Sequence, residues 1–203
     1  MQRDDLHWLI NELRSLTGDL GQLAGHDEPD LVLAIDQGGH ASRAIVFDRT
    51  GREVAEAFAA VRADRSGNDR VEHVATEVLD SIRTALADVC QSLGTDVRRV
   101  AAAGLATQRS SVVCWDKRTR AALSPVLSWQ DRRNAAALKG WQARDADVRR
   151  ITGLPLSPHY GASKIKWCLD ELPAVRDAAA RGHLVAGPLA SWLLQQLLPG
   201  QPA

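Results

Sequence analysis

The 203-residue sequence lacks several features that would place it in a class of proteins at once. Its 25 basic and 25 acidic residues cancel, so the basic excess typical of a general nucleic-acid binder is missing. No apolar run approaches the ~20 residues that a membrane-spanning helix needs. The N-terminus carries acidic residues and has no long apolar core, unlike a signal peptide. We therefore expect a cytoplasmic protein that binds neither nucleic acid nor membranes.

Cysteine is scarce, and the three that occur are Cys90, Cys114 and Cys168. They are far apart in apolar surroundings and show no CxxC spacing. An odd number without a signal peptide indicates free thiols in a reducing compartment. We expect them to behave as small buried residues. Metal-ligand spacing is also missing among the histidines. Hydrophobic residues make up 45% of the chain, which is enough for a sizeable core.

Residues 1–30 have a pattern of their own. Leucines recur there at steps of three and four residues, which is the seam of an amphipathic helix. Gly18 and Gly21 interrupt the pattern, and each costs a helix about 1 kcal/mol. This predicts a helix over about residues 4–16, which either packs on its own domain or serves in docking or dimerisation. The composition of residues 25–30 predicts a linker, so residues 1–30 form a leader before a domain over residues 31–203.

Strands come first in this domain, and helices follow. Residues 31–36, 43–48 and 52–61 are apolar runs separated by short turns, which predicts a three-stranded meander. A helix over residues 74–93 and a buried strand over residues 100–107 come next. The later segments predict short strands at 111–116, 125–129 and 183–187 and helices at 131–141, 163–172 and 189–198. This order predicts an α/β domain with a mixed sheet flanked by helices.

An acidic residue and a glycine turn follow the first strand. Asp36 ends the strand, Gly38, Gly39 and His40 form the turn, and Arg43 follows it. Backbone N–H groups of such a turn can cradle a phosphate, and a carboxylate beside it can hold Mg²⁺. The same residues also suit a glycine-rich hairpin with a turn-capping aspartate.

Residues suited to ligand binding occur at three further places. Thr107, Gln108 and Arg109 lie at the end of the strand over residues 100–107, and ligands of α/β proteins bind at such strand ends. Trp129 offers a flat face for the C–H groups of a polyol. His159, next to Tyr160 in a proline-rich loop, has the chemistry of a general base. Each also has a structural reading: an arginine capping a loop, a core tryptophan before a helix, and a loop histidine without a catalytic role.

Together these segments resemble the N-terminal domain of the FGGY family of carbohydrate kinases, and its glycerol kinases in particular. The matching stretches include LVLAIDQGGHASRAIVFDRTGREVA, VAAAGLATQRSSVVCWDKRT, VLSWQDRRNA and ITGLPLSPHYGASKIKWCLDE. They run in the family's order at close to its spacing over about residues 31–198. The resemblance implies an actin-like (ribonuclease H-like) ATPase fold, as the first of two domains that close over a cleft. It also implies Mg²⁺ and ATP as cofactors and a small polyol or sugar as substrate.

The resemblance further implies roles for individual residues. Asp36 would help to bind Mg²⁺. The residues expected beside the transferred phosphate are Gly38, Gly39, His40 and Arg43. The residues expected to contact the polyol are Arg109, Ser110, Trp129, His159 and Tyr160. Phosphoryl transfer depends chiefly on positioning and charge stabilisation, which is what such residues supply.

The sequence also departs from the glycerol kinase pattern. Gly39 and His40 replace two threonines, Ser110 replaces a polyol-binding glutamate, and His159 replaces a tyrosine. Each change weakens the assignment to glycerol, because a lost hydrogen bond to a charged group costs about 1.5–3 kcal/mol.

The family's catalytic aspartate and second domain have no counterpart among these residues, so no catalytic base is assigned. One hypothesis is a kinase half that is inactive alone and needs a second chain for the base and the nucleotide site. The alternative is a non-catalytic binding or regulatory module, self-associating through residues 1–30, or a truncated gene product derived from a glycerol-kinase-like enzyme.

Overall fold

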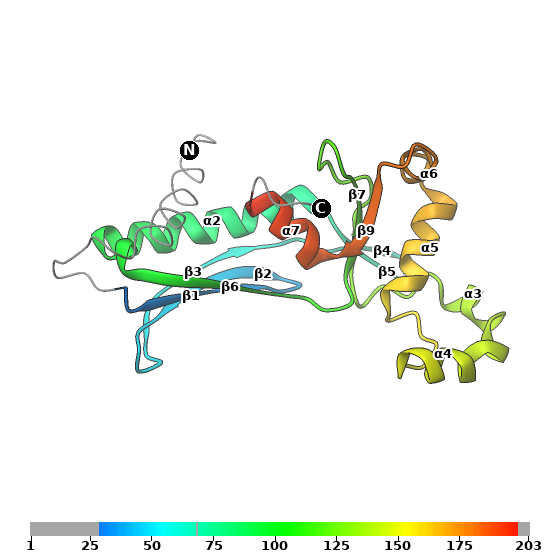
Figure 1. The fold of residues 1–203 in the computed structure, drawn as a ribbon, viewed down its shortest axis with the longest axis horizontal. Coiled ribbons are helices and arrows are strands. Elements are labelled where there is room, and N and C mark those ends of the chain that lie inside the picture. Colours follow the sequence, from blue (N-terminus) through cyan, green and yellow to red (C-terminus); the bar gives the residue numbers. More distant parts are fainter. Residues whose placement is uncertain (1–28, 68, 199–203) are drawn as a thin grey trace. The chain divides into compact units, whose positions relative to one another are not determined.

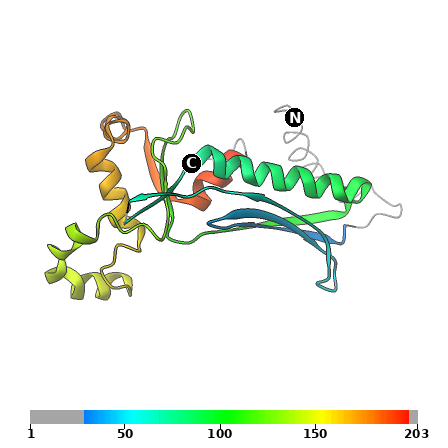
Figure 2. The ribbon, with the colours of Figure 1, turned by 180° about the vertical axis from the view of Figure 1, so that it is seen from behind.

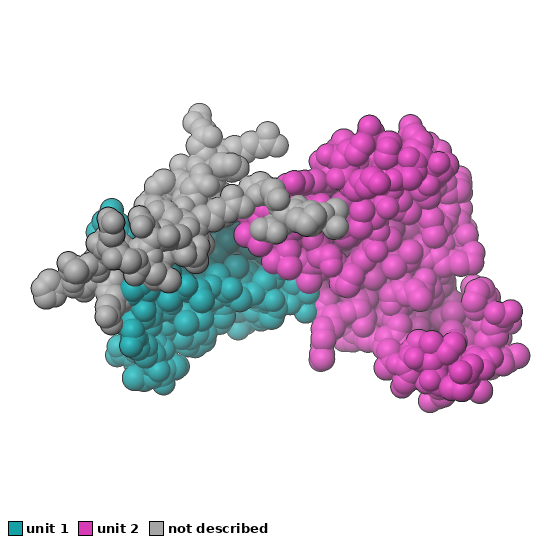
Figure 3. All heavy atoms as spheres, viewed as in Figure 1, with its two compact units in different colours: residues 1–61, 77–107 teal, residues 62–76, 108–203 magenta. Residues whose placement is uncertain are grey.

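The computed structural model describes residues 29–67 and 69–198, so the leucine-patterned helix expected over about residues 4–16 lies outside the described residues. The chain divides into two compact units, coloured separately in Figure 3. Of the described residues, the first unit contains 29–61 and Glu77–Thr107, and the second contains 62–67, 69–76 and 108–198. Neither unit is a continuous stretch of sequence, because the chain leaves the first unit after Val61 and returns to it at Glu77.

The first unit contains a four-stranded mixed sheet in the order β3-β2-β1-β6 (Figure 1). Strands β1 and β2 pair antiparallel, as do β2 and β3, while β6 lies parallel to β1. The bounds are β1 Leu31–Gln37, β2 Ala41–Phe47, β3 Glu53–Ala60 and β6 Val100–Thr107. The meander and the parallel fourth strand confirm the mixed sheet that the sequence predicts.

One face of this sheet packs against helix α2, which spans Ala75–Leu93 and runs along the sheet in Figures 1 and 2. Side chains alternate along β1: Leu33 and Ile35 are buried, whereas Val32 on the opposite face is 48% exposed. Apolar residues spaced by three and four positions give α2 its buried stripe. The Ser42 hydroxyl of β2 hydrogen-bonds the Ser81 hydroxyl of α2 at 2.7 Å, which fixes the helix on this face.

The second unit contains a five-stranded sheet in the order β4-β5-β8-β7-β9, and all its paired strands are antiparallel. The strands are β4 Asp64–Gly67, β5 Arg70–His73, β7 Val112–Asp116, β8 Val126–Leu127 and β9 Leu184–Pro188. The helices are α3 Ala135–Lys139, α4 Asp145–Thr152, α5 Gly161–Glu171, α6 Pro173–Ala180 and α7 Leu189–Leu197. No helix among the described residues has both the length and the hydropathy to cross a membrane.

The core of the second unit joins strands to helices and includes two of the three cysteines. Cys114 of β7 and Cys168 of α5 are fully buried in a cluster with Val112, Leu127 and Val175. All three cysteines are free, and Cys90 of α2 is half-buried. The expectation of free thiols is thus confirmed, and two of them fill core positions.

The helix predicted over residues 131–141 is wrong in its bounds, because α3 covers only Ala135–Lys139. The Asp131 carboxylate accepts a hydrogen bond from the Val71 N–H of β5. This contact holds the residues just before α3 in a loop. Four elements were also absent from the sequence prediction: β4, β5, α4 and α6. The two strands among them are short. All positions of β4 are exposed, so its sequence has no apolar alternation from which a strand could be predicted.

Candidate functional site

The glycine turn after β1 is held at both of its sides. The Gly38 N–H donates to the Ala41 carbonyl at 2.9 Å, and the His40 carbonyl accepts from the Val61 N–H at 2.8 Å. A Cβ at Gly38 would lie 3.2 Å from the Ala41 oxygen, so the tight turn favours glycine there. Among the described residues, the N–H groups of Gly39 and His40 have no hydrogen-bond acceptor. The turn therefore presents two adjacent backbone donors, which is the element of an anion-binding nest.

Asp36 and Arg43 lie directly opposite each other across β1 and β2, next to this turn. Both side chains are exposed and project from the sheet face opposite α2. Neither makes an ion pair or hydrogen bond with another described residue. The first unit thus places a carboxylate, a guanidinium and two backbone donors within a few residues of one strand end.

A divalent cation fits this group of residues in a limited way. Within residues 29–67 and 69–198, no three His, Cys, Asp or Glu side chains form a metal cluster. Mg²⁺, however, is commonly held by one or two carboxylates together with substrate phosphate oxygens and waters. Asp36 alone suits that arrangement, because its carboxylate is exposed and unpaired among the described residues.

The polar residues that follow β6 belong to the second unit and form a turn with left-handed backbone at its centre. Ser110 has a φ of 64°, a conformation that costs a non-glycine residue energy. Arg109 before it is exposed and makes no ion pair with a described residue. Ser111 after it is fully buried, and its hydroxyl donates to the Gln108 side-chain carbonyl at 2.7 Å.

Ser111 connects this turn to the loop that carries Trp129. The Trp129 N–H donates to the Ser111 hydroxyl oxygen at 2.9 Å, and the neighbouring Ser128 N–H donates to the Val71 carbonyl. The indole of Trp129 remains 42% exposed. The structural alternative of a core tryptophan is therefore wrong.

The rings of Trp129, His159 and Tyr160 contact one another in sequence. The His159 ring contacts the Trp129 ring edge-on, with 5.9 Å between centroids and 69° between planes. Tyr160 contacts His159 in the same way at 5.1 Å and 84°. Edge-to-face contacts of this kind are worth about 0.5–1.5 kcal/mol each. Two segments that are distant in sequence thus form one half-exposed aromatic surface.

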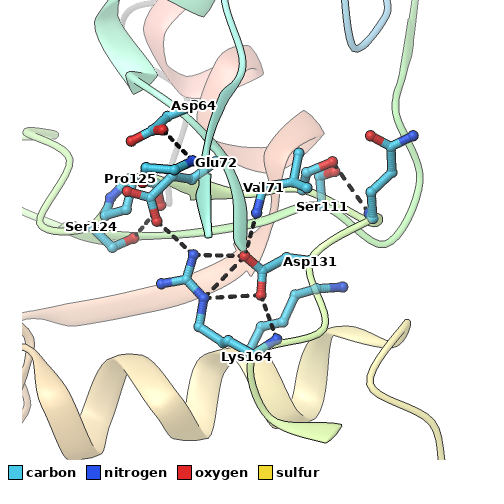
Figure 4. Close-up of polar contacts among 12 residues, drawn as sticks. Asp64, Val71, Glu72, Ser111, Ser124, Pro125, Asp131 and Lys164 are labelled. Carbon is cyan, nitrogen blue, oxygen red and sulfur yellow. Dashed lines mark hydrogen bonds and ion pairs between the residues drawn. The ribbon is translucent and has the colours of Figure 1, made fainter. Parts of the chain in front are cut away.

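The loop after Trp129 also takes part in a largely buried ionic cluster, part of which Figure 4 shows. The Arg133 guanidinium lies 2.6 Å from both the Asp131 and the Glu72 carboxylates, and its side chain is only 4% exposed. Burial disfavours the charge on Arg133, but the two carboxylates outweigh that effect and raise its pKa. The cluster ties β5 to the loop after Trp129.

Lys164 is the residue whose role the sequence did not reveal. It lies in the first turn of α5, is 1% exposed, and donates from Nζ to the main-chain oxygens of Ser110, at 3.2 Å, and of His159. Burial lowers its pKa to about 8, against the opposing charge of Asp131. Every residue has a backbone carbonyl, so the residue types at positions 110 and 159 do not reveal that these carbonyls accept from Lys164. No sequence motif could therefore predict this contact.

The structure therefore groups the candidate residues in two sets. Asp36, Gly38, Gly39, His40 and Arg43 lie in the first unit. In the second unit, side-chain and main-chain contacts connect the Ser110 turn, Trp129, His159 and Tyr160. The second set offers flat aromatic faces beside polar groups, and a cation at Arg109 that pairs with no described carboxylate, which suits a small polar ligand with C–H faces.

Comparison with known proteins assigns the chain to a family. Residues 31–200 match the FGGY family of carbohydrate kinases, N-terminal domain. The chain belongs to this family, and its fold is that of the actin-like ATPases.

Among its relatives, the chain is most informatively compared with glycerol kinases. It is 37% identical to the glycerol kinase of Leptothrix cholodnii over 172 residues, which are 84% of this chain and 35% of that protein. It is also 37% identical to the glycerol kinase of Rhodospirillum rubrum over 171 residues, covering 83% of this chain and 34% of that protein. The chain therefore spans about a third of the length of these curated relatives.

Solved structures show the same fold at lower sequence identity. The crystal structure of Plasmodium falciparum glycerol kinase with ADP superposes with a TM-score of 0.79 at 20% identity, over 88% of this chain and 36% of that one. The xylulose kinase from Rhodospirillum rubrum superposes with a TM-score of 0.72 at 18% identity, over 82% and 34%. Both confirm the fold that the sequence predicts.

Proposed function

We propose that this chain is the polyol-contacting half of an ATP-dependent carbohydrate kinase of the glycerol kinase type. The observation that carries the proposal is the grouping in the second unit. Three segments that are distant in sequence bring Ser110, Trp129, His159 and Tyr160 onto one connected framework, with Arg109 beside Ser110. The glycerol kinase relatives support the substrate class, and the family match supports the transfer of a phosphoryl group.

The second-unit residues would bind and orient the acceptor. Arg109 would donate to substrate hydroxyls through its planar fork. The exposed face of Trp129 would cover the C–H groups of a polyol, as aromatic rings commonly do in such sites. Ser110 offers a hydroxyl where glycerol kinases carry a glutamate, and His159 keeps an aromatic ring at the position of a tyrosine. The acceptor is therefore a small polyol or sugar and need not be glycerol.

The first-unit residues would meet the phosphate. ATP would supply the γ-phosphoryl group, and Asp36 would hold Mg²⁺ together with phosphate oxygens. The N–H groups of Gly39 and His40 would donate to phosphate oxygens, and the Arg43 guanidinium would offset their charge. Gly39 and His40 stand where the glycerol kinase turn has two threonines, so the threonine hydroxyls are missing. The backbone N–H groups of the turn would therefore contribute a larger share of phosphate binding.

The base that deprotonates the acceptor hydroxyl is not assigned to any residue of this chain. We therefore expect catalysis to need a further polypeptide that supplies the base and most of the nucleotide site. The test is a coupled assay for ADP with ATP, Mg²⁺ and glycerol or a pentose. The chain is assayed alone and mixed with the part of the Leptothrix cholodnii glycerol kinase that it does not cover.

We expect no turnover from the chain alone and ADP release from the mixture. The matched control is the mixture with Arg109→Ala, which should lose acceptor-dependent ADP release, because the exposed Arg109 contacts substrate and not its own fold. Turnover by the isolated chain would overturn the need for a partner. A mixture that stays inactive with every acceptor would contradict the kinase-half proposal.

A second candidate is a non-catalytic binding module. The observation that favours it is Ser110, which removes the acidic acceptor for substrate hydroxyls while the aromatic surface remains. It predicts that polyol binds to the isolated chain and that no mixture releases ADP.

A further inference from the structure

We infer that Lys164 is the positioning residue of the polyol-contacting surface: it ties the Ser110 turn to the His159 loop so that Ser110, Trp129 and His159 keep one arrangement. This inference rests on the proposed function, because only that proposal makes the surface a polyol-contacting one. The contacts themselves do not depend on it.

The first argument is the geometry of the two hydrogen bonds. Lys164 Nζ donates to the carbonyl oxygens of Ser110 and His159, which are 49 positions apart by their residue numbers and belong to different loops. Both acceptors are main-chain atoms, so Lys164 sets the path of the backbone whatever side chains these positions carry. One ammonium with three donors can hold two carbonyls in a way that an apolar residue cannot.

The second argument is that Lys164 occupies a place that disfavours it. It is 1% exposed, although an ammonium loses hydration on burial. It also lies in the first turn of α5, where the helix dipole disfavours a cation. A leucine or methionine there would avoid both costs. A residue that breaks two local rules together is expected where a site needs it.

The third argument is that the held segments carry the surface. The His159 ring packs edge-on against Trp129, so a shift of the His159 backbone would separate the two rings. Ser110 is held with a φ of 64°, a conformation that needs support from its surroundings. The Ser111 hydroxyl supplies the other link, from the same turn to Trp129. Lys164 and Ser111 together close a ring of contacts through three loops.

The close packing at the start of α5 makes this reach possible. A Cβ at Gly161 would lie 2.7 Å from the Val112 side chain, so the helix start approaches β7 as closely as a glycine allows. Lys164 lies at the end of the same turn, and its side chain then spans from α5 to the turn before β7.

The test compares Lys164→Met with the matched control Lys166→Met. Lys166 lies on the same helix but is exposed and pairs with Asp170. The readout is the nuclear Overhauser effect between the Trp129 indole and His159 ring protons in the 203-residue chain, with resonances identified by Trp129→Phe and His159→Gln. We expect the effect in the wild type and in Lys166→Met, and its loss in Lys164→Met. A merely structural lysine would lower the urea midpoint and leave the ring contact in place, which would overturn the inference.

A second variant covers the case in which Lys164→Met does not fold. Lys164→Gln keeps hydrogen-bond donors, but its side chain is one bond shorter and reaches at most one of the two carbonyls. We expect the ring contact to weaken or disappear in it as well. A wild-type ring contact in either folded variant overturns the inference, as does its absence from the wild type.

Glycerol titration separates this inference from the proposed function. The shift of the Trp129 indole resonance reports binding, and we expect about tenfold weaker binding for Lys164→Met than for Lys166→Met. Equal binding by the two variants overturns the role of Lys164. If neither glycerol nor a pentose, titrated in the same way, shifts the wild-type resonance, the proposed polyol contact by this chain is contradicted, and the ring contact alone decides on Lys164.

Discussion

The guanidinium of Arg133 lies over the indole ring of Trp167, with 4.2 Å from its central carbon to the ring centroid. The same group is paired with the carboxylates of Asp131 and Glu72. It therefore bridges the loop after Trp129, strand β5 and helix α5 with one side chain. An arginine suits this place better than a lysine, because a planar guanidinium can stack on a ring and donate to carboxylates in its own plane.

Replacing Arg133 by methionine should destabilise the protein strongly. The change leaves the fully buried Asp131 carboxylate, and the partly exposed Glu72 carboxylate, without their cation, and we expect a loss of about 3–5 kcal/mol in the free energy of unfolding. Urea denaturation followed by circular dichroism measures it. Arg150→Met is the control, because Arg150 and Asp147 form an exposed pair, and such a pair contributes about 0–1 kcal/mol. Similar losses in the two variants would contradict a buried cluster.

Gly161→Ala should destabilise the second unit by overpacking. The added Cβ would lie 2.7 Å from the Val112 side chain, and extra atoms in a packed place typically cost about 1–3 kcal/mol. Val112→Ala in the same chain should recover part of that loss, which a double-mutant cycle measures. Gly39→Ala is the control, because no atom lies within 4 Å of its added Cβ. A Gly161→Ala protein as stable as the Gly39→Ala protein would show that the helix start does not approach β7 this closely.

Asp36→Asn should reduce activity without reducing stability. The side chain is exposed and makes no hydrogen bond or ion pair with a described residue, so we expect the free energy of unfolding to change by less than about 0.5 kcal/mol. In the reconstituted mixture, loss of the metal-facing carboxylate should lower ADP release by about 10²-fold or more. Asp80→Asn on the exposed side of α2 should leave both quantities unchanged. Full activity of Asp36→Asn would remove Asp36 from the phosphate site.

Stability should depend on pH above neutrality because of Lys164. Burial lowers the pKa of Lys164 to about 8 in the folded protein, whereas the unfolded chain has the ordinary value of 10.5. Between these values the unfolded state binds more protons than the folded state, so the contribution of Lys164 rises with pH in that range. Below about pH 8 both states carry the proton, and this contribution is constant.

Urea midpoints measured from pH 7 to pH 10.5 check this sign. The stability of the wild type minus that of Lys164→Met should increase across the range, because the other titrating groups are common to both proteins. Lys166→Met is the control for the loss of a lysine from the same helix, because Lys166 is exposed and pairs with Asp170. A difference for Lys164→Met that falls with rising pH would mean that the folded state favours the charged lysine.

The first unit follows from its sequence because its pattern is periodic. Alternation in Leu31–Gln37 and the spacing of apolar residues in α2 each assign a buried face directly. The second unit is harder because its strands are short and partly charged. Strand β5, with the sequence RVEH, pairs with a two-residue strand, and tertiary contacts rather than propensity decide both.

The candidate site shows the same division. Asp36 and Arg109 could be predicted as site residues from the sequence, because each lies at the end of an apolar strand. The aromatic and glycine residues could be predicted because their residue types suit ligand binding. The role of Lys164 could not be predicted, because its hydrogen-bond partners are main-chain carbonyl oxygens, which every residue has. The contact of Trp129 with His159 likewise depends on loops whose paths no local pattern fixes.

The excursion of the chain between its two units has a consequence for the order of folding. Strand β5 leaves the ribosome before α2 and β6, yet its pairing partner β8 is made only after both of them. The first unit can therefore acquire all its strands while the β4–β5 hairpin still lacks β8, the other strand that pairs with β5. Such delayed pairing between residues far apart in sequence slows folding. A nascent chain should accordingly gain protease resistance in two stages, and the second should begin once the residues up to Leu127 have emerged.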